Sequence, residues 1–126
     1  MTQQIDFDFV PGALYRVSVC YSLNTTRAVF SLPATAKQRK AWPNRILVGG
    51  RPLLKVENGT YVMCVGHPRM IETHYELEGE KEDVGRNWMT SFIVDGKIVD
   101  WIDWRSDGDF QQYLVNCQLW FEKVTT

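Results

Sequence analysis

Short apolar segments separated by turn residues run along most of the chain, and the first of them has the two-residue period of a half-buried strand. In the segment Leu14 to Tyr21, one face carries Tyr15, Val17, Val19 and Tyr21. Pro11-Gly12 precedes it, and Pro33 follows a second apolar segment, Arg27 to Leu32. We expect a strand over each segment.

Two dipeptides predict tight hairpins, because their residues tolerate the positive φ that type I′ turns require. Asn58-Gly59 would join Leu53–Glu57 to Thr60–Gly66. The second of these strands is apolar on both faces, so we expect it to lie centrally in a sheet.

The second dipeptide is Asp95-Gly96, between Met89–Val94 and Lys97–Ile102. A two-residue loop would set Val94 opposite Lys97. The pairs would then run back through Ile93/Ile98, Phe92/Val99, Thr90/Trp101 and Met89/Ile102. Both faces of this hairpin carry apolar side chains.

Other segments have weaker patterns. We expect one or two helical turns over Thr35–Trp42 and a short strand at Ile46–Val48. The polar stretch from His67 to Asn87 is interpreted as a long loop, with a short strand at Ile71–Tyr75 left open as an alternative. The C-terminal segment could be a helix through Phe110, Tyr113, Leu114 and Cys117, or a helical turn followed by a closing strand from Leu119 to Val124; we favour the second.

These elements predict a mainly β fold: a small, partly open antiparallel barrel with one or two short helices. The segments VPGALYRV, ENGTYVMCVG and SFIVDGKI, in that order, resemble the small Src-homology-type barrels, related to Tudor and KOW modules, of bacterial and phage proteins. The resemblance implies a binding module rather than an enzyme. By analogy, an accessory or inhibitor protein of a phage or mobile element would fit.

Composition supports one folded domain over residues 1–126. Apolar residues make up 44% of the chain and charged residues 23%, which is typical of globular proteins. The 14 lysines and arginines nearly balance 15 carboxylates, so any charged partner must be met by a local patch. We find no signal-peptide pattern or membrane-spanning run, and therefore expect a cytoplasmic protein.

The three cysteines, Cys20, Cys64 and Cys117, are odd in number and stand in apolar surroundings, which is typical of buried free thiols. We expect no disulfide. Cys64 and His67 have the spacing of a metal-ligand pair, but residues three apart on a strand face opposite sides, and no second close pair completes a zinc site. We expect no metal and no other cofactor.

The chain shows no catalytic pattern. Its two histidines, His67 and His74, lie near the expected loop, and neither a nucleophile nor a phosphate-binding glycine pattern is present. Four aspartates near the C-terminus do not have calcium-loop spacing, and we interpret them as a solvated acidic rim: Asp100, Asp103, Asp107 and Asp109. An enzyme of unrecognised type is the third hypothesis.

Two binding hypotheses remain, and the leading one is a protein partner. Trp88, Trp101 and Trp104 lie close together in the sequence near the two-sided hairpin, where one barrel interior cannot cover both faces. Trp101 and Trp104 lie three apart, so on a continuous strand at most one faces the interior.

The alternative hypothesis is nucleic-acid binding through a basic segment over 37–51. Five cations there could neutralise phosphates, and a tryptophan could stack on bases. The residues are Lys37, Arg39, Lys40, Trp42, Arg45 and Arg51.

Overall fold

The structure is a computed structural model that describes residues 7–32, 46–47, 53–77, 80–103 and 108–124. The described residues form nine strands, a 3-10 turn η1 and a helix α2. The strands are β1 Leu14–Val17, β2 Arg27–Ser31, β3 Ile46–Leu47, β4 Leu53–Glu57, β5 Tyr61–Cys64, β6 Arg69–Leu77, β7 Glu80–Val94, β8 Lys97–Asp103 and β9 Phe121–Lys123; η1 is Tyr21–Leu23 and α2 is Phe110–Cys117. The fold is mainly β, as the sequence predicted.

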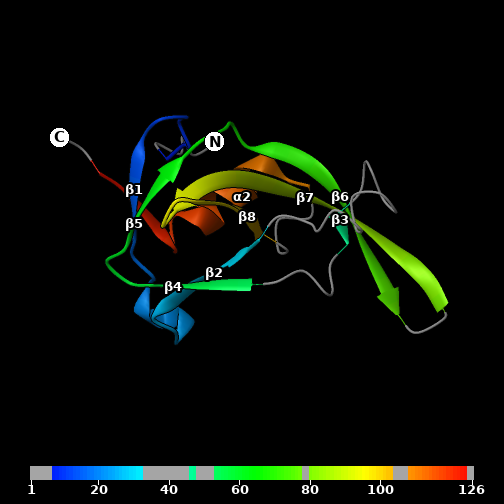
Figure 1. Ribbon diagram of the computed structural model, residues 1–126. Coiled ribbons are helices and arrows are strands. Elements are labelled where there is room, and N and C mark those ends of the chain that lie inside the picture. Colours follow the sequence, from blue (N-terminus) through cyan, green and yellow to red (C-terminus); the bar gives the residue numbers. More distant parts are fainter. Residues whose placement is uncertain (1–6, 33–45, 48–52, 78–79, 104–107, 125–126) are drawn as a thin grey trace, which may run out of the picture.

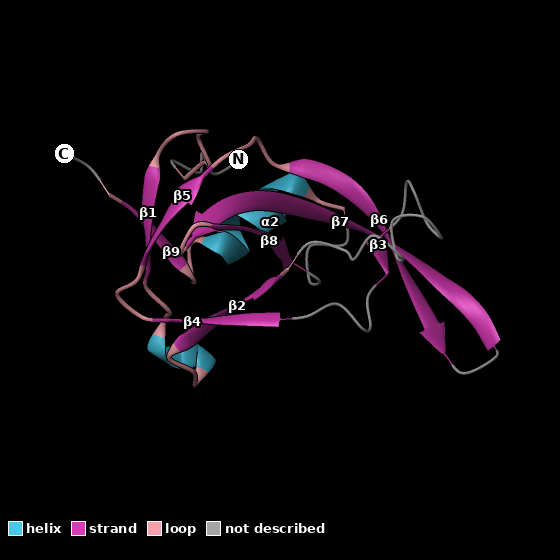
Figure 2. Cartoon of the chain, in the orientation of Figure 1, coloured by secondary structure: helices cyan, strands magenta, loops and turns pink. Residues whose placement is uncertain are grey.

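The strands form one sheet in the order β4-β2-β8-β7-β5-β1-β9, while β6 pairs with the first half of β7 and with β3. The pairs are antiparallel except β3–β6, which is parallel. Figures 1 and 2 show the sheet curving round α2, with the far end of the β6–β7 hairpin extending away from the other strands. The sheet does not close, because β4 and β9 end the strand order. This confirms the predicted partly open barrel-like fold with short helices.

The hairpin at Asp95-Gly96 is confirmed down to its register. Asp95 has φ 50° and Gly96 has φ 74°, as a type I′ turn requires. Val94 faces Lys97, and the pairing continues through Ile93/Ile98 to Met89/Ile102. Two positive-φ residues therefore set the relative position of β7 and β8.

The hairpin predicted at Asn58-Gly59 is wrong, because β4 pairs with β2 while β5 pairs with β1 and β7. Gly59 has φ 88°, but Asn58 is not among the residues with positive φ, so the turn is not type I′. Its backbone is bonded elsewhere: Asn58 N–H donates to Thr26 O (2.9 Å) and Gly59 N–H to Val17 O (2.8 Å). The turn carries the chain from the β4 edge to β5 beside β1, so the ends of the sheet approach each other.

The long loop predicted over His67–Asn87 is also wrong, whereas the short strand considered at Ile71–Tyr75 lies within β6. Most of the predicted loop forms β6 and the first part of β7, in a regular ladder from Arg69/Met89 to Tyr75/Asp83. Hairpin pairing satisfies the backbone groups of both strands, so polar residues can occupy such strands. The sequence therefore lacked the apolar alternation that identifies a half-buried strand.

Predictions for the two ends of the chain were partly correct. The first strand is shorter than expected: β1 ends at Val17, and Tyr21, predicted to lie on its buried face, is 92% exposed in η1. The favoured alternative for the C-terminal segment is confirmed, because α2 precedes the short strand β9. The Asp109 carboxylate caps α2 by accepting from Gln112 N–H at 3.1 Å.

Aromatic side chains fill the inside of the curved sheet. Phe9, from the segment before β1, is fully buried and contacts the rings of Tyr15, Phe92, Tyr113 and Phe121 at centroid distances of 5.2–6.2 Å. The Tyr15 hydroxyl ties that segment down by donating to Asp8 O (2.6 Å) and accepting from Val10 N–H (2.8 Å). Among the described residues, no helix is long and apolar enough to cross a membrane.

Candidate functional site

A row of apolar side chains crosses the outward face of four adjacent strands. Leu14 on β1 pairs with Met63 on β5, Met63 pairs with Ile93 on β7, and Ile93 pairs with Ile98 on β8. Leu14 is 40% exposed, Met63 41% and Ile98 56%, and Ile93 is half-buried. We call these four residues the apolar row.

The apolar row faces outward because its neighbours in each strand face inward. The adjacent positions Tyr15, Val62, Phe92 and Val99 are each no more than 1% exposed. Successive residues of a strand point to opposite faces of the sheet, so these strands carry apolar side chains on both. The inward set makes the core, and the outward set is left at the surface.

Polar and aromatic groups border the apolar row at its β1 end. Tyr61, 57% exposed, is paired with Arg16, whose guanidinium donates to Glu122 Oε2 at 2.6 Å. This ion pair is exposed, so it adds little stability. The combination of an apolar centre and a polar border is the usual composition of a protein-binding patch.

Next to Ile93 and Ile98, the apolar row borders a polar cluster. Ser91 Oγ donates to Asp100 Oδ1 at 2.7 Å, and Arg69 Nη2 lies 3.2 Å from Ser91 Oγ and 3.9 Å from Asp100 Oδ1. Ser91 is 7% exposed and Asp100 9%. These groups satisfy one another, so we assign the cluster a structural role.

The acidic rim predicted near the C-terminus is wrong at Asp100 and Asp103, whereas Asp109 is exposed. Asp100 and Asp103 are buried, 9% and 8% exposed, and Asp103 Oδ2 accepts from Asn116 Nδ2 at 2.7 Å. Asp109 caps α2, and Asp107 lies outside the described residues. The alternation along β8 turns the Asp103 side chain toward the interior. The hydrogen bond from Asn116 on α2 offsets the cost of burying this carboxylate.

The structure describes two of the three tryptophans expected at a partner surface. Trp101 is 6% exposed and packs on Phe30, Trp120 and Phe121 at centroid distances of 4.9–5.4 Å. Trp88 is half-buried, and its Nε1 donates to Gly108 O at 3.0 Å. Both rings therefore face inward, while Trp104 lies outside the described residues, and partner binding through these tryptophans stays a prediction.

The three cysteines are free, and their settings differ. Cys64 and Cys117 are fully buried, as predicted, but Cys20 is half-buried and its Sγ lies 3.1 Å from Ser22 Oγ. Burial raises the pKa of the Cys117 thiol well above its usual range and raises that of Cys64. The hydrogen bond with Ser22 lowers the pKa of Cys20.

Metal-ligating side chains do not gather within the described part of the chain. The Cys64 thiol donates to Gly66 O at 3.2 Å, so it is already hydrogen-bonded to the backbone two residues further along the chain. We derive no metal or cofactor chemistry from these residues.

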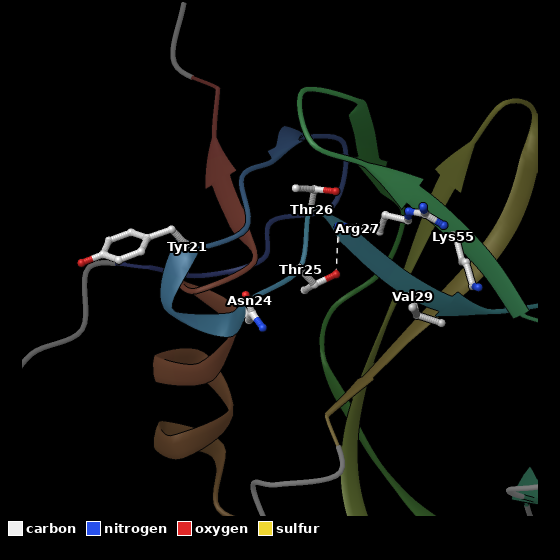
Figure 3. Close-up of a pocket in the computed structure, with 7 residues that line it drawn as sticks. All are labelled: Tyr21, Asn24, Thr25, Thr26, Arg27, Val29 and Lys55. Carbon is white, nitrogen blue, oxygen red and sulfur yellow. Dashed lines mark hydrogen bonds between the residues drawn. The ribbon is translucent and has the colours of Figure 1, made fainter.

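A hollow of about 540 Å³ lies beside η1 and strands β2 and β4. It is lined by Tyr21, Asn24, Thr25, Thr26, Arg27, Val29 and Lys55. Figure 3 shows the Arg27 and Lys55 side chains near each other, whereas the Tyr21 ring points away. Arg27 Nε pairs with Glu57 Oε1 at 3.0 Å, while no described residue forms an ion pair with Lys55. The hollow thus carries one cation that its described neighbours do not neutralise.

The residues of the predicted basic segment, Lys37, Arg39, Lys40, Trp42, Arg45 and Arg51, lie outside the described residues. The apolar row was not named as a site from the sequence. The sequence did indicate strands with apolar side chains on both faces. Only the register across four strands shows that their outward residues align in a row.

Comparisons with known proteins give no family for the chain. No family model matches it, and neither curated proteins nor solved structures give a match. Any functional assignment must therefore come from its own residues.

Proposed function

We propose that this chain is a non-enzymatic interaction module that binds another protein through the apolar row. The supporting observation is the register that aligns Leu14, Met63, Ile93 and Ile98 across four strands. Single exposed apolar residues are ordinary on protein surfaces, but a contiguous set with a polar border is typical of an interface. Association would remove these side chains from water, and this burial is favourable.

The charge around the apolar row favours a protein over a nucleic acid. Binding to nucleic acid depends on cations that neutralise phosphates. Beside the apolar row, the Arg16 guanidinium is paired with Glu122, and the chain as a whole has a formal net charge of −1. A protein surface with its own apolar patch is the better complement.

The proposal includes a cytoplasmic setting and an accessory or inhibitory role of the kind met in phages and mobile elements. The three free cysteines support the setting, because reduced thiols persist in reducing compartments. The resemblance to small Src-homology-type barrels, itself still a proposal, supports the role.

The test replaces Met63 and Ile98 together by Glu in the otherwise unchanged chain. A matched control is Val115→Glu, because Val115 is exposed to a similar extent, 40%, but lies on α2. Each protein is used to capture partners from host lysate with and without nuclease treatment, after circular dichroism has shown that the fold is kept.

We expect the unchanged chain and Val115→Glu to recover the same nuclease-resistant protein, and the double variant to lose it. Equal recovery by all three chains would show that the apolar row does not bind. Recovery that disappears on nuclease treatment would favour the basic segment and nucleic acid instead.

A further inference from the structure

Strand β4 ends the strand order, and among the described residues it pairs only with β2. On the other side of its five residues, which we call the open side, no described strand is paired. An edge strand of this kind is a template for a further strand unless side chains prevent pairing.

The alternation of hydrogen-bonded pairs along the β2–β4 ladder shows which β4 residues direct their backbone N–H and C=O groups to the open side. Asn58 N–H donates to Thr26 O directly across the β2–β4 ladder, so 26/58 is a hydrogen-bonded pair. Such pairs alternate along an antiparallel ladder, and the register is regular from Arg27/Glu57 to Ser31/Leu53. Leu54 and Val56 therefore bond to β2.

The backbone groups of Leu53, Lys55 and Glu57 consequently point to the open side. The Glu57 carbonyl accepts from Thr60 N–H in the following turn at 3.2 Å. The open edge thus offers the N–H and C=O of Leu53, the same pair from Lys55, and the N–H of Glu57.

Side chains along this edge suit a particular added strand. Lys55 lies at the centre, borders the hollow, and has no ion pair with a described residue. Glu57 is already neutralised by Arg27. On the inward face, Val56 is 4% exposed and Leu54 packs against the core, so apolar side chains beside them would extend the core layer.

We propose that the β4 edge binds an extended peptide segment of a partner as an additional antiparallel strand, with an acidic residue opposite Lys55 and an apolar residue on each side of it. The acidic side chain forms a cross-strand pair with the Lys55 ammonium. The two apolar side chains point inward beside Leu54 and Val56, and the main chain bonds to the open backbone groups of β4.

This site does not depend on the apolar row, because β2 separates β4 from the nearest strand of that row, β8. A lysine on an edge strand opposes pairing with most segments, since its charge would be left without a partner. An acidic residue at the opposing position removes this cost, so Lys55 selects the segment rather than blocking the edge.

The probe is a short fluorescein-labelled peptide in which one glutamate stands between two valines, flanked by threonines. Its binding to the full chain is followed by fluorescence anisotropy. Comparison probes are the same peptide with lysine in place of glutamate, and the original peptide with backbone N-methyl groups on the side that would bond to β4. Lys55→Glu is the matched protein variant.

We expect Lys55→Glu to weaken binding of the glutamate peptide about tenfold, since an attractive pair becomes a repulsive one. The lysine peptide should show the reverse preference and bind Lys55→Glu better than the unchanged chain. N-methylation should abolish binding to both chains. The variant Met63→Glu with Ile98→Glu should bind the peptide as the unchanged chain does, so failure of the apolar-row proposal is distinguished from failure here.

Three outcomes would overturn the proposal. One is the absence of measurable binding of the glutamate peptide to the unchanged chain. The second is equal binding of the glutamate peptide to Lys55→Glu and the unchanged chain. The third is full binding of the N-methylated peptide, which would show that main-chain pairing is not involved.

Discussion

The ring of Trp101 lies where two parts of the aromatic core meet, between Phe30 on β2 and Trp120 and Phe121 near the C-terminus. These neighbours are distant in sequence, so the indole joins segments that no local interaction holds together. Its buried Nε1 interacts with the Cys117 thiol but forms no hydrogen bond of regular geometry with a described residue. The contribution of Trp101 to stability therefore comes from ring packing.

We expect Trp101→Ala to lower the free energy of unfolding by about 3 to 5 kcal/mol, as removal of a buried aromatic ring does. Tyr21→Ala is the matched control, because this ring is 92% exposed, and its effect should stay within about 0.5 kcal/mol. Urea denaturation measures both. Equal losses from the two substitutions would contradict the placement of Trp101 in the core.

The buried Cys117 thiol makes the stability of the protein depend on alkaline pH. Burial raises the pKa of this thiol in the folded protein above the ordinary value of 9.0, which applies to the unfolded chain. Above pH 9 the unfolded chain releases the proton while the folded chain retains it, so unfolding becomes more favourable as pH rises. Below pH 9 the thiol is neutral in both states and contributes no pH dependence.

Stability should fall above about pH 9, with Cys117 contributing a slope of up to about 1.4 kcal/mol per pH unit. The variant Cys117→Ala should show a shallower fall over this range, whatever its stability at neutral pH. Urea denaturation across a pH series measures the slope, with Cys20→Ala as the control that keeps it. An unchanged slope in Cys117→Ala would show that this thiol is not the titrating group.

At the scale of elements, the Asp95-Gly96 turn determines the pairing of β7 with β8. Asp95 has φ 50°, a conformation that asparagine tolerates well and alanine does not. We expect Asp95→Ala to lower the free energy of unfolding by about 1 to 2 kcal/mol and Asp95→Asn to leave it nearly unchanged. Thermal unfolding of both variants checks this prediction; equal losses would assign the effect to the lost carboxylate.

The two dipeptide turns show what local sequence can and cannot predict. Both have residues suited to positive φ, yet only Asp95-Gly96 joins paired strands. The strands beside Asn58-Gly59 find their partners far away in the sequence, β2 on one side and β1 on the other, and side-chain alternation within a short segment carries no information about such partners.

The β6–β7 hairpin shows a different limit. The full length of its strands was missed, although a short strand at Ile71–Tyr75 was left open. Their outer parts are polar at successive positions, so the period that identifies a half-buried strand is absent. By contrast, β1, β2, β5 and the start of the C-terminal helix were predictable, since each buries one face. Prediction succeeded where burial leaves an alternating pattern in the sequence and failed where the sequence has no such pattern.

At the scale of the whole molecule, the open curved sheet has more apolar surface than its interior can contain. The sequence predicted this excess at the Asp95-Gly96 hairpin and interpreted it through tryptophans. The structure places Trp101 in the core and leaves smaller side chains at the surface instead, in the apolar row. The proposed partner surface therefore depends on register between β1, β5, β7 and β8, which no single segment of the sequence encodes.

Site-specific photocrosslinking in host cells tests the proposed function most directly. A benzophenone amino acid is placed at Met63 or at Ile98, and at Val115 on α2 as the control. If the apolar row binds a protein, positions 63 and 98 will crosslink to one and the same protein, and position 115 will not. Crosslinking to that protein from position 115 alone, or equal unspecific crosslinking from all three positions, would contradict the account.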